Sequence, residues 1–145
     1  MEKLSETTRR LMNERFGRDS LLALATVDGE KPAVRAVNGY YADGAFYVIT
    51  HAQSRKMKHL SANPRIAICG DWFTADGTGE NLGWIRKPEN EALAAVLREA
   101  FAEWYGNGHT NEEDPDTVIL KIQLTEGVLF HHGTRYHIDF TGTDD

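Results

Sequence analysis

Residues 33–66 have the sequence AVRAVNGYYADGAFYVITHAQSRKMKHLSANPRI. Two apolar runs, 33–41 and 45–50, flank the dipeptide Asp43-Gly44, and glycine tolerates the positive φ that a tight hairpin turn requires. A short helix is expected next, over residues 54–62, because an Asn-Pro pair follows and proline ends a helix. The stretch therefore predicts a β-hairpin whose second strand leads directly into a helix.

The start of this expected helix carries an unusual charge. Arg55, Lys56 and Lys58 fall within about its first turn, with no acidic residue nearby. Cations at a helix N-terminus oppose the helix dipole, at a cost of roughly 0.3–1 kcal/mol each at an exposed site. A bound phosphate would reverse this repulsion, because free N–H groups, the hydroxyls of Thr50 and Ser54 and the cations together form an anion site. The alternative is an exposed basic helix whose charges lie in solvent.

The residues around this helix are more basic than the rest of the chain. The net charge of the 145 residues is -6, yet residues 31–66 contain six cations and one acid, a local charge of +5. Arg35 lies within a run of small apolar residues, where a cation is rare unless it is paired, so Arg35 is expected to face the same anion. The alternative is an outward-facing Arg35 on a half-solvated strand. A compact basic region in an acidic protein favours a small anionic ligand over a nucleic acid, with chance clustering as the other explanation.

The rest of the chain predicts a mainly β protein with flanking helices. Apolar residues at helical spacing predict a helix over residues 5–16 and a longer one from Pro88 to about Trp104, followed by an acidic loop. About seven or eight short antiparallel strands favour a closed or split β-barrel, formed by residues 1–145 as a single domain. The further strands are expected over 21–27, 65–74, 78–85 and 118–124, then two more ending at Phe140, with turns at Asp76-Gly77, Glu126-Gly127 and His132-Gly133.

The composition bears on the cellular location expected for the protein and on the metal and cysteine chemistry expected of it. No run approaches the roughly 18–20 apolar residues of a membrane span, so no membrane partner is expected. The charged N-terminus lacks a secretion signal, and the single cysteine, Cys69, fits a cytoplasmic setting. Cys69 is expected to be a small buried residue beside Ile68. The C-terminal histidines lack the spacing of zinc motifs, so no metal site is predicted.

The motifs of residues 33–66 resemble those of a known family. Ala33–Val37 and Asp43–Thr50, followed by Ser54-Arg55-Lys56 and Asn63-Pro64-Arg65, are similar to the pyridoxamine 5'-phosphate oxidase family of FMN-binding split barrels. The resemblance covers roughly residues 20–85, in order and at the spacing of the family. The C-terminal half is similar only loosely.

This resemblance implies a cofactor, an assembly and an activity. It implies a homodimer with FMN at the subunit interface, although FAD or a deazaflavin would present a phosphate too. The implied activity is that of a flavin-dependent oxidoreductase with a small-molecule redox partner, in which the flavin rather than a side chain carries the chemistry. The alternative is a flavin-binding carrier or redox sensor without turnover. The implied cofactor-binding residues are Arg35, Ala36, Val37, Asn38, Ile49, Thr50, Ser54, Arg55, Lys56 and Asn81.

The roles within this set differ. Arg55 and Lys56 are implied to bind the FMN phosphate, and Asn81 is implied to reach the isoalloxazine ring of the neighbouring subunit.

The C-terminal region departs from the pattern of the family. Arg135-Tyr136-His137 is similar to an Arg-Leu-His motif, so Arg135 and His137 are the implied substrate-binding residues. However, Phe140 takes the place of a second Arg, and Asp144 and Asp145 follow. A substrate phosphate would meet repulsion there. We therefore expect little or no oxidation of pyridoxamine or pyridoxine 5'-phosphate.

Overall fold

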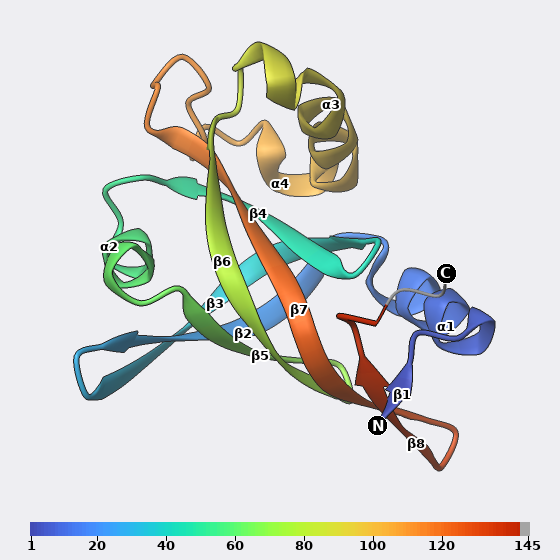
Figure 1. Cartoon of the computed structure of the whole chain (residues 1–145). Helices are drawn as coiled ribbons and strands as arrows, with labels where there is room; N and C mark the ends of the chain where they lie inside the picture. Colours follow the sequence, from blue (N-terminus) through green and yellow to red (C-terminus); the bar gives the residue numbers. More distant parts are fainter. Residues whose placement is uncertain (143–145) are drawn as a thin grey trace.

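Six antiparallel strands close a barrel in the computed structural model, which describes residues 1–142 (Figure 1). The hydrogen-bonded order is β4-β3-β2-β5-β6, and β7 pairs with both β6 and β4, which closes the circle. The prediction of a mainly β, antiparallel barrel is confirmed. The barrel strands are β2 (Ser20–Asp28), β3 (Lys31–Ala42), β4 (Ala45–His51), β5 (Arg65–Gly70), β6 (Phe73–Trp84) and β7 (Thr117–His131).

Two further strands extend the sheet beyond the barrel. β8 (Thr134–Asp139) forms a hairpin with the last part of β7, and the short β1 (Glu2–Lys3) runs parallel to β8. The sequence analysis did not predict β1, because two residues carry no periodicity.

The helices lie around the barrel. They are α1 (Glu6–Phe16), α2 (Arg55–Ala62), the 3-10 turn η1 (Pro88–Asn90), α3 (Glu91–Ala100) and α4 (Ala102–Tyr105). The first two agree with the expected helices, whereas the third expected helix is interrupted at Phe101. Within residues 1–142, no helix has the length and apolarity needed to cross a bilayer.

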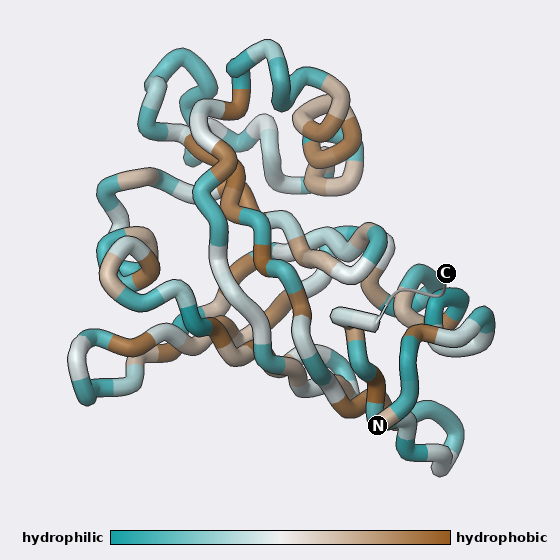
Figure 2. Tube along the Cα trace, in the orientation of Figure 1, coloured by the Kyte–Doolittle hydropathy of each residue, from teal (hydrophilic) through white to brown (hydrophobic). Residues whose placement is uncertain are grey.

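Alternate residues of each strand fill the interior of the barrel. On β2, for example, Leu22, Leu24 and Thr26 are buried. The ring of Phe16 on α1 packs at 5.5 Å from that of Phe46 and so connects α1 to this core. A second apolar cluster, formed by α3 with Ile85 and Ile119, lies outside the barrel. Figure 2 shows hydrophobic residues, in brown, along the crossing strands and on α3.

Glycines have two different roles in this sheet. The turns predicted at Asp43-Gly44 and His132-Gly133 are confirmed, with positive φ at both residues of each pair. The turns predicted at Asp76-Gly77 and Glu126-Gly127 are wrong, because both pairs lie inside strands. A Cβ on Gly77 would lie 2.6 Å from the Gln123 carbonyl oxygen, so glycine there permits close approach of β6 and β7 at a bulge. The turn that joins β5 to β6 is at Asp71-Trp72.

Candidate functional site

The N-terminus of α2 contains a buried hydroxyl that has no partner. Ser54 is the N-cap residue, yet its side chain bonds to no N–H group of the helix. Its Oγ atom is buried and lacks any hydrogen-bond partner within residues 1–142. An unpaired buried polar atom costs roughly 1–3 kcal/mol, so such an atom calls for an explanation. A ligand at the start of α2 would provide the missing partner.

Three cations lie around this position. Burial and then the charge of Arg55 lower the pKa of Arg35, while burial and then the charge of Arg35 lower the pKa of Lys56. Arg35 Nη1 also bonds to Thr26 Oγ1, which bonds to His59 of α2, so hydrogen bonds connect Arg35 of β3 to the helix that carries Arg55 and Lys56. Within residues 1–142 none of them forms a salt bridge with a carboxylate. We call Arg35, Ser54, Arg55 and Lys56 the anion site.

The position of Arg35 follows from strand alternation. Arg35 lies on the same side of β3 as the buried Val37, which is the inner side of the barrel. Its Nη1 donates to Thr26 Oγ1 at 2.7 Å and, at 3.3 Å, to the carbonyl of Leu24. Arg35 therefore points to the inner side of the barrel, and the outward-facing alternative is wrong. That Arg35 faces a bound anion stays a prediction.

A phosphate group fits the anion site. The first amides of α2 have no acceptor within the helix and point out of its N-terminus. Together with an orphaned hydroxyl and three uncompensated cations they form the donor set that binds phosphate oxygens in proteins. The absence of an acid from the first turn of α2 agrees with this interpretation.

The other residues implied as cofactor contacts lie on different faces. Ala36 and Asn38 are on the outer side of β3, where the Asn38 amide donates to Asp19 at 2.9 Å. Val37 is buried in the barrel, so its backbone alone is available to a ligand. Ile49 packs against the second apolar cluster.

Thr50 and Asn81 line two different hollows. Thr50 shares one hollow with His51 and Asp114. Asn81 shares the other with Gln53, which precedes Ser54, and with Met57 of α2. Neither residue belongs to the anion site itself.

Arg135 and His137 lie far from the anion site in one chain. Both are on β8, and Figure 1 shows α2 (green) and β8 (dark red) on opposite sides of the barrel. Arg135 is exposed, and His137 Nε2 lies 3.6 Å from Glu126 Oε2. A single chain therefore does not bring the implied substrate-binding residues to the implied cofactor residues.

Hydrogen bonds to Glu112 hold the segment between α4 and β7 in place. No pattern in the sequence predicted this role for Glu112. Its carboxylate accepts two bonds of 2.8 Å from Arg98, and the Tyr105 hydroxyl also donates to it. These contacts, Arg98 first, lower the pKa of Glu112 to about 2. The Glu112 carbonyl accepts a bond from the Trp84 ring. An acidic residue in an apparent loop gives no signal in the sequence that it will be paired in this way.

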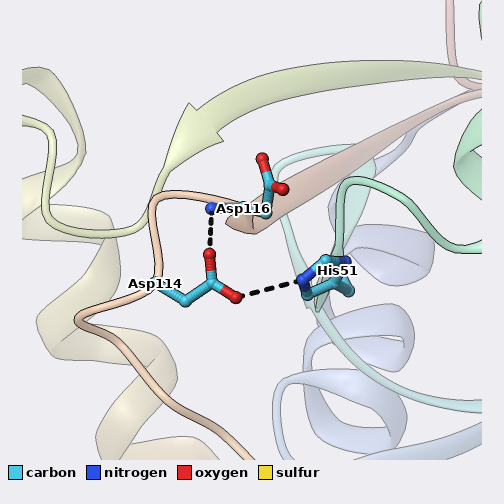
Figure 3. A group of neighbouring side chains, drawn as sticks. All are labelled: His51, Asp114 and Asp116. Atoms are coloured by element: carbon cyan, nitrogen blue, oxygen red, sulfur yellow. Dashed lines mark hydrogen bonds and ion pairs between the residues drawn. The ribbon is translucent and has the colours of Figure 1, made fainter.

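The same segment holds the β4–α2 connection. The Asp116 carbonyl accepts the Ala52 N–H at 2.7 Å, and Asp114 Oδ2 lies 3.1 Å from His51 Nε2 (Figure 3). The Asp116 N–H and then the His51 ring lower the pKa of Asp114. The connection that precedes Ser54 is thus fixed by residues more than 50 positions later in the chain.

His51, Asp114 and Asp116 also have the spacing of a metal site, since their ligand atoms all lie within 4.8 Å of one another. However, His51 Nδ1 accepts the N–H of Gln53 at 3.2 Å, so the ring proton is on Nε2 and is donated to Asp114. Both ring nitrogens are therefore occupied by hydrogen bonds. This arrangement favours a structural role for His51, which holds the two segments together, over a role as a metal ligand.

Comparison with known proteins identifies the family. A sequence profile of the pyridoxamine 5'-phosphate oxidase family matches residues 9–131. The chain belongs to this family. The match runs from α1 through β7, so it contains the closed barrel and α2 and leaves out β8.

Similar proteins support this assignment. The chain is 30% identical over 117 residues to a pyridoxine/pyridoxamine 5'-phosphate oxidase of Anaplasma phagocytophilum (strain HZ). The aligned region covers 74% of this chain and 55% of that relative. The chain thus spans about half the length of this relative. The crystal structure of an FAD-binding protein from Mesorhizobium loti is similar at a TM-score of 0.67 and 16% identity, over 86% of this chain and 92% of that one. General Stress Protein 26 from Bacillus anthracis is similar at a TM-score of 0.63 and 18% identity, over 82% and 90%. These two likenesses confirm the split-barrel fold.

The Glu112 contacts predict a pH-dependent stability. A carboxyl whose pKa is lowered on folding stabilises the native state above its ordinary pKa of about 4.5, and this contribution is lost as the pH falls toward 2. We expect Glu112→Gln to lower the free energy of unfolding by about 2 kcal/mol at pH 7 and by much less at pH 3. The control, Glu113→Gln, changes an exposed neighbour and should alter stability by less than about 0.5 kcal/mol. Urea unfolding at both pH values tests this, and an effect of Glu112→Gln that is equal at pH 7 and pH 3 would contradict it.

Proposed function

We propose that the anion site binds the phosphate of FMN and that the protein is a flavin-dependent oxidoreductase acting with a small-molecule redox partner. The observation that carries the proposal is the buried Oγ of Ser54, which has no partner among residues 1–142, together with three cations that form no salt bridge with a carboxylate there. Membership of the pyridoxamine 5'-phosphate oxidase family supports a flavin over other phosphates. When bound, FMN supplies hydride and electron transfer.

The residues of this chain would hold and orient such a cofactor. Arg55, Lys56 and the first amides of α2 bind the phosphate, and Ser54 donates its hydroxyl to it. Arg35 adds a third cation from the adjacent strand. Asn81, in the hollow lined by Gln53 and Met57, is the residue we propose to reach the isoalloxazine ring of the neighbouring subunit. Mass spectrometry of the ligand released from the purified protein distinguishes FMN from FAD and a deazaflavin.

An exposed apolar face supports a homodimer. Leu21 and Val34, on the outer side of β2 and β3, are 71% and 69% exposed. Ala23, Ala36 and Cys69 are exposed on the same side of the neighbouring strands. The expectation of a buried Cys69 is wrong, because Ile66 and Ile68 face the core and residue 69 therefore faces outward.

We propose that a second copy of the chain covers this face. Contiguous apolar surface of this kind is rare on monomers. Arg35 lines a hollow together with Leu21 and Ala36, so the face borders the anion site, and a partner subunit there would shield a flavin ring held by its phosphate. The two flavins would then lie at the interface between the subunits.

The phosphate contacts predict a selective loss of affinity. Arg55→Ala combined with Lys56→Ala should weaken FMN binding by about 100-fold or more, since each charge-assisted bond contributes roughly 1.5–3 kcal/mol. Riboflavin, which lacks the phosphate, should bind this variant and the wild type equally. The matched control, Lys58→Ala with Arg65→Ala, removes two cations of the same basic region that are not part of the anion site. This control should bind FMN about as tightly as the wild type. Calorimetric titration measures all of these affinities, and FMN binding that is unchanged in the first variant would refute the site.

The apolar face predicts a change in mass. Light scattering should give the mass of two chains for the wild type. Leu21→Glu combined with Val34→Glu should give one chain, because buried charges at an interface are costly. Val96→Glu alters an exposed apolar residue on α3 and serves as the control, which should remain dimeric. A flavin-loaded wild-type monomer would rule out the proposed assembly.

The C-terminal departure from the family pattern predicts poor activity on vitamin B6 phosphates. These substrates bring a second phosphate, and Phe140 stands where the pattern of the family has a second Arg to hold it. Flavin-loaded protein should oxidise pyridoxamine and pyridoxine 5'-phosphate slowly or not at all, while nicotinamide cofactors should reduce its flavin in stopped-flow experiments. Ordinary turnover of either B6 phosphate that Arg135→Ala abolishes would contradict this prediction. A flavin that no nicotinamide cofactor reduces would favour the carrier or sensor alternative.

A further inference from the structure

A buried polar relay leads from the anion site into the body of the protein. Arg35 Nη1 donates to Thr26 Oγ1 at 2.7 Å, and this oxygen lies 2.9 Å from His59 Nδ1. Thr26 is 1% exposed and His59 is 8% exposed. On the far side of the ring, His59 Nε2 lies 3.8 Å from a carboxylate oxygen of Asp28, which is largely exposed.

The direction of the hydrogen bonds in this relay follows from the chemistry of arginine. A guanidinium only donates, so Thr26 Oγ1 accepts from Arg35 and its own hydrogen is left for His59. That hydrogen can be donated to His59 Nδ1 when the ring proton is on Nε2, the nitrogen that faces Asp28. In this arrangement the Thr26 hydroxyl bonds to Arg35 and to His59 at once.

The relay joins the two elements that form the anion site. His59 is on α2, one turn after Arg55 and Lys56, whereas Thr26 is on β2 and bonds to Arg35 of β3. One hydroxyl thus connects the helix that carries two cations to the strand that carries the third. Because like charges repel, these cations would separate if nothing held them.

We propose that Thr26 and His59 are positioning residues that hold Arg35 beside Arg55 and Lys56, so that the three cations are assembled before a phosphate arrives. This inference rests on the proposed FMN function. Preassembly matters because a ligand that must first order the side chains loses part of its binding free energy. The folded structure offsets the repulsion between these like charges by means of the buried Thr26 hydroxyl and the buried His59 imidazole.

The test compares FMN with riboflavin in two pairs of variants. Thr26→Val has nearly the same shape but lacks the hydroxyl, and Thr26→Ser restores it. His59→Leu removes the acceptor, and His59→Asn places an amide oxygen close to the position of Nδ1. We expect Thr26→Val and His59→Leu to weaken FMN binding about tenfold with riboflavin affinity unchanged, and Thr26→Ser and His59→Asn to bind FMN within about threefold of the wild type.

A double-mutant cycle shows whether Thr26 acts through Arg35. In an Arg35→Gln background, Thr26→Val should weaken FMN binding no further, because there is no guanidinium to position. Thermal melting of each variant confirms that it is folded, and the His59 pair replaces the Thr26 pair if Thr26→Val unfolds.

The outcomes separate this inference from the proposed function. Wild-type protein that binds FMN no better than riboflavin refutes the phosphate site itself. Wild-type protein that prefers FMN, together with a Thr26→Val variant of unchanged preference, overturns only the positioning role. Equal losses of FMN and riboflavin affinity, or a full tenfold effect in the Arg35→Gln background, would show that Thr26 has a general structural role instead.

Discussion

Repulsion between like charges is the constraint on which the functional end of this molecule depends. Burial and then the charge of Arg55 lower the pKa of Arg35, while burial and then the charge of Arg35 lower the pKa of Lys56. No carboxylate within residues 1–142 forms a salt bridge with any of the three cations. Such an arrangement persists only when packing fixes the elements that carry the charges. The buried side of α2, with Met57 and Leu60, supplies that packing against the barrel. The site therefore stores electrostatic strain that an anionic ligand would release.

The elements that hold this strain come from distant parts of the chain. The segment fastened at Glu112 fixes the β4–α2 connection through Asp114 and Asp116, and Thr26 of β2 fixes Arg35. The first set of contacts acts on the anion site through the backbone before Ser54, whereas Thr26 acts directly on the Arg35 side chain. The same logic explains why residues of a family motif lie on several faces of the barrel, since strand alternation sends Ala36 outward and Val37 inward.

Local sequence patterns predicted much of the fold around β4 and α2. Asp43-Gly44 marked a hairpin, a proline ended α2, and cations without acids at the start of a helix indicated an anion. The failures concern choices made by distant partners. The prediction of a turn at Gly77 is wrong because the role of this residue, close approach to the Gln123 backbone, depends on the register between β6 and β7. Thr26 and His59 carry no motif, although a hydroxyl in line with Leu22 and Leu24 was a usable hint of a buried polar contact.

Strand β7 has a consequence for the order in which the molecule folds. It pairs with β4, β6 and β8 and begins only at residue 117, so the barrel cannot close until most of the chain is available. Contacts of such long sequence separation slow folding, because loop-closure entropy is lost before they form. Until closure, β6 has an unpaired edge, which in a partly folded chain invites association with other strands. Productive folding of this protein is therefore a competition between the arrival of β7 and the pairing of that edge with a neighbouring molecule.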